Sequence, residues 1–328
     1  MGLLKVIKKH LTIQYVGIIV HEESCFIKTK RVKKGKTVYE EKKQFAIVSK
    51  EKLSNEVITY LSALQEAFEQ TYLALFLNSY GQGVVPSCSK SVYEKFHIEY
   101  DHVKHICISH QYSIYASHID IKWAEKVFAK TGLDFVFSPF LMLDHLRKNE
   151  SRRDGIVLYM LTSYNSITIM IFDEENLLYG TFINIAKEED LLNTDFTDDL
   201  TEEDDSFDEI DLDMELEESD EIADILDDVM FESDIKSSVQ EEDATIKLKL
   251  FGQDLRLVKY FDASLREFYE NDLYKSDFVT YVKIYDGTGL NEDVVTYLKE
   301  QLLVDVKVRK IDIEDELIAL AVKETEGA

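Results

Sequence analysis

The strongest constraint on the fold of this chain is that one order of predicted elements occurs twice. Three strand-like runs are followed by helix, strand, helix, strand and helix, first in residues 12–148 and again in 154–323. A three-strand meander followed by alternating helices and strands predicts a mixed sheet covered by helices. The duplication therefore predicts an α/β protein with one domain over residues 1–153 and a second over 154–187 plus 246–328.

Turn-forming and helix-capping residues divide the first half. Gly35 suits a turn between strands, Ser54 suits the N-cap of a long helix, and Pro139 suits a first helical turn. The apolar face predicted for that long helix consists of Val57, Leu61, Leu64, Phe68 and Leu75. The remaining elements are predicted at Val103–Ser109 (strand), Asp120–Lys130 (helix), Leu133–Phe137 (strand) and Phe140–Arg147 (helix).

The second half repeats this pattern around an insertion. Its three opening strands are predicted at Ile156–Leu161, Ile167–Phe172 and Leu177–Ile185. The later elements are predicted at Asp254–Tyr269 (helix), Phe278–Tyr285 (strand), Asn291–Leu303 (helix), Val304–Ile311 (strand) and Glu314–Lys323 (helix).

The negative charge of the chain is concentrated in the insertion. Residues 188–243 contain 27 of the 64 acidic residues and one basic residue, Lys236, which leaves 37 acidic and 36 basic residues elsewhere. Such a charge density predicts a largely disordered acidic insertion over 188–245. It also argues against nucleic acid as a partner, because binding phosphates requires a cationic surface.

One stretch of the insertion supports two interpretations. The apolar residues Ile222, Ile225, Leu226, Val229 and Met230 fall on one face of a candidate helix across Asp220–Phe231. This is either a solvated spacer with nascent helicity or an acidic helix that docks on a basic groove. The spacing of an EF-hand calcium loop is absent from the insertion.

The chain lacks clear signals for secretion, membrane spanning or metal binding. Cys25, Cys88 and Cys107 form no CxxC motif and are interpreted as reduced thiols of a cytosolic protein, with a disulfide or zinc site as the less favoured alternative. No apolar run approaches the roughly 20 residues of a transmembrane helix. The histidines near Cys107 lack the i, i+4 spacing of a zinc motif and are interpreted as surface or strand-end residues: His102, His105, His110 and His118.

The most specific local segment is Tyr281–Val306. A hydrophobic strand runs into Asp286, Gly287, Thr288 and Gly289, and an amphipathic helix follows. Glycines allow close approach of the backbone to a ligand, and a helix N-terminus presents free N–H groups. These four residues are therefore predicted to bind nucleotide, with ATP and magnesium as candidate cofactors. The alternative is a plain strand-to-helix turn.

This segment resembles the adenosine motif of the actin, sugar-kinase and chaperone ATPase superfamily. The first twenty residues and the stretch Leu133–Phe140 resemble the PilM family of type IV pilus assembly proteins, whose fold is shared by the cytoplasmic domain of the type II secretion L protein. The resemblance implies two RNase H-like (actin-like) domains facing a cleft. It also implies a cytoplasmic scaffold, peripheral to the inner membrane, that binds the cytoplasmic tail of a membrane subunit in a pilus, type II secretion or DNA-uptake (competence) machine.

The chain departs from that superfamily at both phosphate loops. Ile19 and His21 stand where the first loop carries Asp and Gly, and Glu22 and Glu23 would repel phosphate. The second loop should read Asp-x-Gly, whereas residues 159–161, or a nearby register, offer neither residue. Because phosphoryl transfer requires a positioned metal and close backbone contacts with phosphate, we predict a pseudo-ATPase without catalytic or metal-binding residues. The alternative is an ATP-dependent enzyme, either an ATPase or a kinase.

Two further features suggest additional partners. The stretch Met1–Leu11 is basic and amphipathic, which suits either weak contact with an anionic membrane surface or a frayed terminus. The acidic insertion is predicted to recruit a basic partner such as a motor ATPase. A weaker third interpretation is an acidic chaperone-like or ion-buffering protein, for which deletion of residues 188–243 would abolish function.

Overall fold

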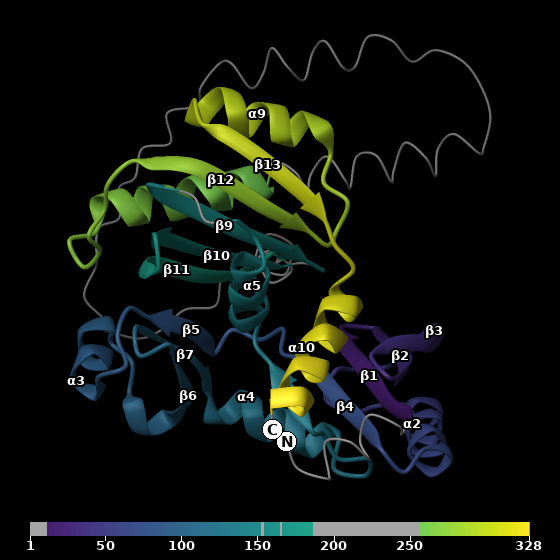
Figure 1. The fold of residues 1–328 in the computed structure, drawn as a ribbon. Helices are drawn as coiled ribbons and strands as arrows, with labels where there is room; N and C mark the ends of the chain where they lie inside the picture. The colour runs from purple at the N-terminus through teal and green to yellow at the C-terminus, as the bar shows by residue number, and fades with distance from the viewer. Residues whose placement is uncertain (1–11, 152–153, 165, 186–255, 328) are drawn as a thin grey trace, which may run out of the picture. The chain divides into compact units, whose positions relative to one another are not determined.

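Two five-stranded sheets with the same strand order form the framework of the protein (Figure 1). The computed structural model describes residues 12–151, 154–164, 166–185 and 256–327. The first sheet has the order β3-β2-β1-β4-β8 and the second has the order β11-β10-β9-β12-β13. In both sheets the first three strands are antiparallel and the last two run parallel to the central strand. The duplication and the fold class, two RNase H-like (actin-like) halves, are thereby confirmed.

The strands of both sheets follow the predicted meander-then-crossover order. The first sheet contains β1 (Thr12–His21), β2 (Ser24–Lys33), β3 (Lys36–Ala46), β4 (Thr71–Phe76) and β8 (Phe135–Phe137). The second contains β9 (Ile156–Ser163), β10 (Ser166–Asp173), β11 (Asn176–Asn184), β12 (Val279–Asp286) and β13 (Asp305–Lys310). The central strands β1 and β9 are almost continuously buried, as expected for strands covered on both faces, whereas the edge strand β3 is half-buried on one face and exposed on the other.

The last helix of each half packs on the sheet of the other half. Helix α5 (Pro139–Lys148) contacts β9 and β10, and helix α10 (Ile313–Gly327) contacts β1 and β4. One hydrophobic core therefore contains residues of both halves, such as Phe76, Phe140 and Leu317. The exchange ties the halves together, because unpacking either helix would expose apolar surface on both sheets.

The outer faces of the two sheets are covered by helices of their own halves. Helices α2 (Asn55–Ala67) and α4 (His118–Val127) pack on the first sheet, and the helical residues 256–270 and α9 (Glu292–Leu302) pack on the second. The predicted cap at Ser54 is present, and Asn291 caps α9; each side chain accepts a hydrogen bond from an amide in the first turn.

Two predictions for the first half were wrong. Helix α2 ends at Ala67, and Leu75 lies in β4 instead of in a longer helix. A short apolar run such as residues 71–76 fits a buried parallel strand as well as a helical stripe, and here sheet pairing with β1 determined the outcome. The predicted strand at Val103–Ser109 exists as β6, but it belongs to a separate sheet.

That separate sheet is a three-stranded antiparallel one inserted between β4 and α4. Its order is β5-β7-β6, with β5 at Gln82–Val85, β6 at Val103–Ile108 and β7 at Tyr112–Ser117. Short helices α3 (Lys90–Tyr93), η1 (Glu94–Phe96) and η2 (Tyr100–His102) connect β5 to β6. The helix predicted from Asp120 to Lys130 is α4, which starts earlier because Ser117 caps it, and which ends at Val127.

The cysteine prediction was also wrong. Cys88 and Cys107 form a disulfide across 19 residues of the inserted region, and only Cys25 is a free, buried thiol. The two cysteines lie far apart in sequence, and the spacing rules address CxxC pairs, so only the antiparallel packing of the inserted sheet could reveal the pair. Burial raises the pKa of the Cys25 thiol to about 12, so this cysteine stays protonated and unreactive.

Two sequence-based predictions fall outside this description. The stretch Met1–Leu11 and the acidic insertion over 188–245 lie outside the described residues. Within the described part of the chain, no helix combines the length and the apolar character that crossing a membrane requires.

Candidate functional site

Asp286 organises the predicted nucleotide loop from within. The residue ends β12 and is only 2% exposed. Its Oδ1 accepts hydrogen bonds from the amides of Thr288 and Gly289 at 3.0 and 2.8 Å, and its Oδ2 accepts one from the amide of Leu290 at 2.9 Å. The hydroxyls of Thr162 and Thr288 also donate to Oδ1, each at 3.2 Å. The loop amides are therefore directed at the protein's own carboxylate.

The two glycines of this loop meet different structural needs. A Cβ atom at Gly287 would lie 2.6 Å from Cδ1 of Ile313, so close packing against the start of α10 requires glycine there. Gly289 has a φ of +86° and open space around its Cβ position, so the backbone conformation requires glycine. Both glycines are explained without a ligand, and nucleotide binding by residues 286–289 stays a prediction.

The turns that correspond to the two phosphate loops are joined by an aromatic contact. The first turn, between β1 and β2, carries the exposed Glu22 and Glu23. Tyr164, in the turn between β9 and β10, places its ring 4.9 Å from that of Phe26 and 5.7 Å from that of His21. Residues 163–166 of this turn, like residues 159–161, include neither Asp nor Gly.

The chemistry of this contact does not suit phosphate. The Tyr164 hydroxyl donates to Oε1 of the buried Glu314 at 3.3 Å. Burial, followed by the nearby Glu314 charge, raises the pKa of Tyr164, so the phenol stays neutral. Burial lowers the pKa of His21, so its imidazole adds no positive charge at neutral pH.

Lysines on the same side of the first sheet are bound to carboxylates around the start of α10 and to Glu40 of β3. The closest pairs join Lys28 to Asp315, Glu40 (2.9 Å) and Asp312 (3.2 Å), Lys30 to Asp315 (2.8 Å), and Lys42 to Glu314 (2.8 Å). Burial alone would lower the pKa of the Lys28 ammonium, but its hydrogen bonds to three carboxylates outweigh that effect and raise the pKa. These cations therefore neutralise the protein's own acids.

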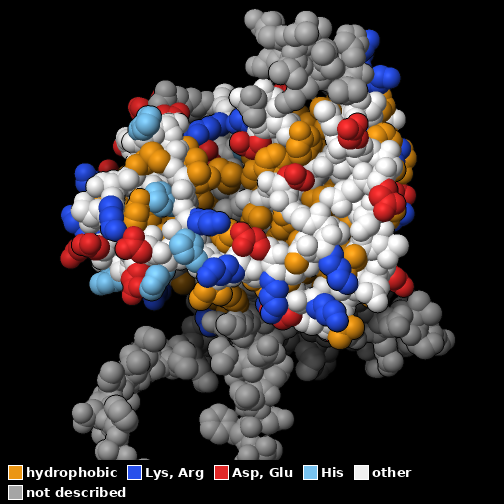
Figure 2. Space-filling view, turned by 90° about the horizontal axis from the view of Figure 1, so that it is seen from below, with side chains coloured by type: hydrophobic (Ala, Val, Ile, Leu, Met, Phe, Trp, Pro, Cys, Tyr) orange, Lys and Arg blue, Asp and Glu red, His pale blue; other side chains and the backbone are white. Residues whose placement is uncertain are grey.

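The histidines do not gather into a metal site within the described residues. Figure 2 shows histidines on one side of the face seen from below, among charged side chains. His105 lies 2.9 Å from the Tyr100 hydroxyl, and His102 lies 2.6 Å from Glu99. Cys107 is held in the disulfide, and no group of three potential ligands converges in the part of the chain that the structure describes.

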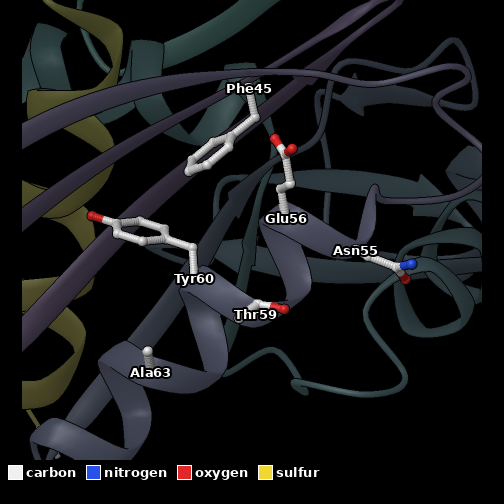
Figure 3. A pocket seen from close by; sticks show the side chains of 6 residues that line it. All are labelled: Phe45, Asn55, Glu56, Thr59, Tyr60 and Ala63. Atoms are coloured by element: carbon white, nitrogen blue, oxygen red, sulfur yellow. The ribbon is translucent and has the colours of Figure 1, made fainter.

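An open, largely apolar groove lies on the first half between β3 and α2 (Figure 3). It has a volume of about 580 Å³ and is lined by Phe45, Asn55, Glu56, Thr59, Tyr60 and Ala63. The rings of Phe45 and Tyr60 face each other with centroids 5.3 Å apart. The Tyr60 hydroxyl donates to Glu41 at 2.8 Å, and the Lys43 ammonium lies 4.2 Å from the Tyr60 ring centre.

This groove suits an apolar side chain from a partner segment. Its aromatic floor offers contact area, and the charged groups at its rim, Glu41 and Lys43, offer polar contacts, which is the usual anatomy of a small protein interface. The sequence resemblance implied binding of the tail of a membrane subunit but did not locate this groove. The sequence signal for this groove was the alternation of aromatic and charged residues along β3. That alternation forms a groove only when α2 packs beside the strand.

Family comparisons divide the chain in the same way as the two sheets do. Residues 158–326 match the family model described as Domain of unknown function (DUF8341). Residues 11–144 match the model described as Domain of unknown function (DUF8569). No curated protein matches the chain.

Solved structures with similar folds span nearly the whole chain. A Bacteroides thetaiotaomicron protein with an actin-like ATPase fold is 11% identical, covers 97% of this chain and 99% of its own, and has a TM-score of 0.47. The PilM-PilN type IV pilus biogenesis complex is 10% identical, covers 90% of this chain and 88% of its own, and has a TM-score of 0.49. The activator of 2-hydroxyisocaproyl-CoA dehydratase from Clostridium difficile, with bound ADPNP, is 10% identical, covers 97% of this chain and 98% of its own, and has a TM-score of 0.38. At these identities the similarity concerns the fold alone.

Proposed function

The chain belongs to the family described as Domain of unknown function (DUF8341), and we propose that it acts as an actin-like binding scaffold and not as a phosphoryl-transfer enzyme. The observation that carries the proposal is the contact of Tyr164 with Phe26 and Glu314 between the two turns. Phosphoryl transfer needs cations and free amides around the phosphates. In this protein the neutral Tyr164 ring and the carboxylates of Glu22, Glu23 and Glu314 surround the β1–β2 and β9–β10 turns.

The working surface of the scaffold is the groove between β3 and α2. The proposed occupant is a segment of the cytoplasmic tail of a membrane protein, which would pack an apolar side chain against the rings of Phe45 and Tyr60. The sequence resemblance of the first twenty residues to the PilM family supports the proposal that this scaffold belongs to a pilus, type II secretion or DNA-uptake assembly. The scaffold would then work in the cytoplasm, at the inner face of the inner membrane.

Two further parts of this proposal concern residues outside the groove. The acidic insertion over 188–245 would recruit a basic partner such as a motor ATPase through its charge. Residues Asp286–Gly289 would retain at most weak contact with ATP, because Asp286 already holds the amides of the loop.

Titration calorimetry with MgATP tests the enzymatic alternative. We expect no binding heat with the full chain at about 1 mM ATP, that is, a Kd above this concentration. Thr288→Arg is the matched variant, because Thr288 is exposed, whereas a side chain at Gly287 would collide with Ile313. Micromolar binding that Thr288→Arg abolishes would place nucleotide at this loop and support an ATPase or kinase.

Site-specific photo-crosslinking in cells tests the partner. A photoreactive residue at Thr59 lies in the groove, and one at the exposed Glu300 on α9 provides the control. We expect an adduct with the tail of a membrane subunit of such a machine from position 59 only. Equal adducts from both positions, or adducts that contain no component of a pilus, secretion or DNA-uptake machine, would contradict the proposal.

A further inference from the structure

The edge strand of the first sheet carries a charge pattern that is complementary to its own reverse. In the described part of the chain, β3 pairs with β2 on one side and has no strand on the other. Its central sequence is Glu40-Glu41-Lys42-Lys43. In an antiparallel pair of two copies, an acidic residue of one chain can lie opposite a basic residue of the other. Opposite charges in directly facing positions stabilise a strand pair.

Two-fold symmetry restricts the register of such a pair. The axis must be normal to the sheet, so facing residues lie on the same face in both copies. A register centred on Lys42 places Glu41 opposite Lys43 and Tyr39 opposite Phe45, each twice by symmetry. These four residues are the half-buried ones that alternate along β3 on the side of α2. The register therefore matches charge with charge and ring with ring on one face.

The other face tolerates the same register. Lys42 would lie opposite itself, but each Lys42 ammonium is 2.8 Å from the buried Glu314 and is thereby neutralised. Val38, which is 58% exposed, would lie opposite Ala46. The bulge in the β2–β3 pairing lies between Arg31 and Val32, at one end of the strand, and leaves residues 39–46 regular.

We propose that β3 is a self-association edge, through which two copies of this chain form a two-fold symmetric dimer with one continuous sheet. Lysines on an edge strand ordinarily discourage pairing. In this strand Lys43 of one copy would lie opposite Glu41 of the other, so the lysine would favour pairing with a second copy. A single strand edge buries little area, so the dimer is expected to be weak and reversible.

The dimer would change the groove between β3 and α2. Tyr39 of the second copy would lie opposite Phe45, at the rim of the groove. Two grooves would also face the same side of one sheet. A pair of grooves allows two tails to bind at once, which raises the apparent affinity for a partner that is clustered in a membrane.

A charge-swap series measured by analytical ultracentrifugation tests the proposal on the full chain of 38.1 kDa. Glu41→Lys places like charges opposite Lys43, and Lys43→Glu places them opposite Glu41. We expect wild type to self-associate at about 100 μM, and each single variant to lose at least tenfold in association constant. Mixing the two variants places Lys opposite Glu at every such position, so the equimolar mixture should recover a dimer.

Two controls separate pairing from misfolding. Lys299→Glu makes the same charge change on the exposed surface of α9 and should associate as wild type does. Lys42→Cys should form an intermolecular disulfide across the axis, whereas Glu41→Cys should not. A wild-type chain that stays monomeric at about 100 μM, or a mixture of the swap variants that stays monomeric while both remain folded by circular dichroism, overturns the proposal.

Discussion

Replacing Asp286 by alanine is expected to destabilise the protein strongly, because five hydrogen bonds end on its carboxylate. Three of the donors are main-chain amides, and two are the hydroxyls of Thr162 and Thr288. Hydrogen bonds to a charged group contribute about 1.5–3 kcal/mol each, and freed groups that reach water recover part of that loss. Thr288 and Gly289 are exposed, whereas Thr162 is 1% exposed. The combined loss is therefore about 4 kcal/mol.

Thermal and urea denaturation measure this loss. A decrease of about 4 kcal/mol corresponds to a Tm lower by about 10 °C for a unit of this size. Asp305→Ala, at an exposed position on β13, is the matched control and should stay within about 0.5 kcal/mol of wild type. If Asp286→Ala were as stable as the control, the carboxylate would not be the partner of the loop amides. Those amides would then be free for a ligand.

Three further predictions concern an ion pair, a glycine and the disulfide. Burial acts to raise the pKa of Asp312, but its hydrogen bonds, among them one from Lys28, outweigh burial and hold the pKa below 3.8. Asp312→Asn should therefore lower the free energy of unfolding by about 0.5–1 kcal/mol at pH 7. This difference from wild type should vanish as the pH falls below 3.8 through the folded-state pKa of Asp312. A difference that is independent of pH would contradict this prediction. Gly287→Ala should cost about 1–3 kcal/mol in urea denaturation, because its Cβ would collide with Ile313, and an unchanged midpoint would refute that packing. Cys107→Ser should lower the free energy of unfolding by about 3 kcal/mol through loss of a cross-link over 19 residues, and reduction of wild type with dithiothreitol should reproduce the loss.

Much of the fold could be read from local pattern because the second half is regular in sequence. The runs at Ile156–Leu161, Ile167–Phe172 and Leu177–Ile185 correspond to β9, β10 and β11 within a few residues. Tight polar turns separate these strands, so each run could pair only with its neighbour in the chain. The order of elements then predicted the mixed sheet without knowledge of any contact.

The secondary structure of the first half was predicted less accurately, because a fully buried strand does not show the alternation of apolar and polar residues that identifies a half-buried strand. The run at residues 71–76 pairs with β1 on one side and β8 on the other, and its apolar residues fit a helical stripe equally well. As a result, β6 was taken for a strand of the main sheet. The inserted sheet β5-β7-β6 became visible only through its antiparallel pairing and through the disulfide between Cys88 and Cys107.

Some features of the candidate site could likewise be predicted from the sequence, and others depended on the tertiary structure. The sequence by itself determined that both phosphate loops lack Asp and Gly, because these residue types are either present at a turn or absent. It also determined the charge of the insertion and the strand-to-helix turn at Asp286–Gly289. Only the tertiary structure decided that the loop amides bind Asp286, that Tyr164 reaches Phe26 in the other half, and that β3 and α2 enclose a groove. The physical reason is that composition and period describe runs of neighbouring residues, whereas the contact of Tyr164 with Phe26 and the groove join residues of different elements. The bonds to Asp286 join near neighbours, but they depend on the backbone conformation of the loop, which the packing of Gly287 against Ile313 restricts.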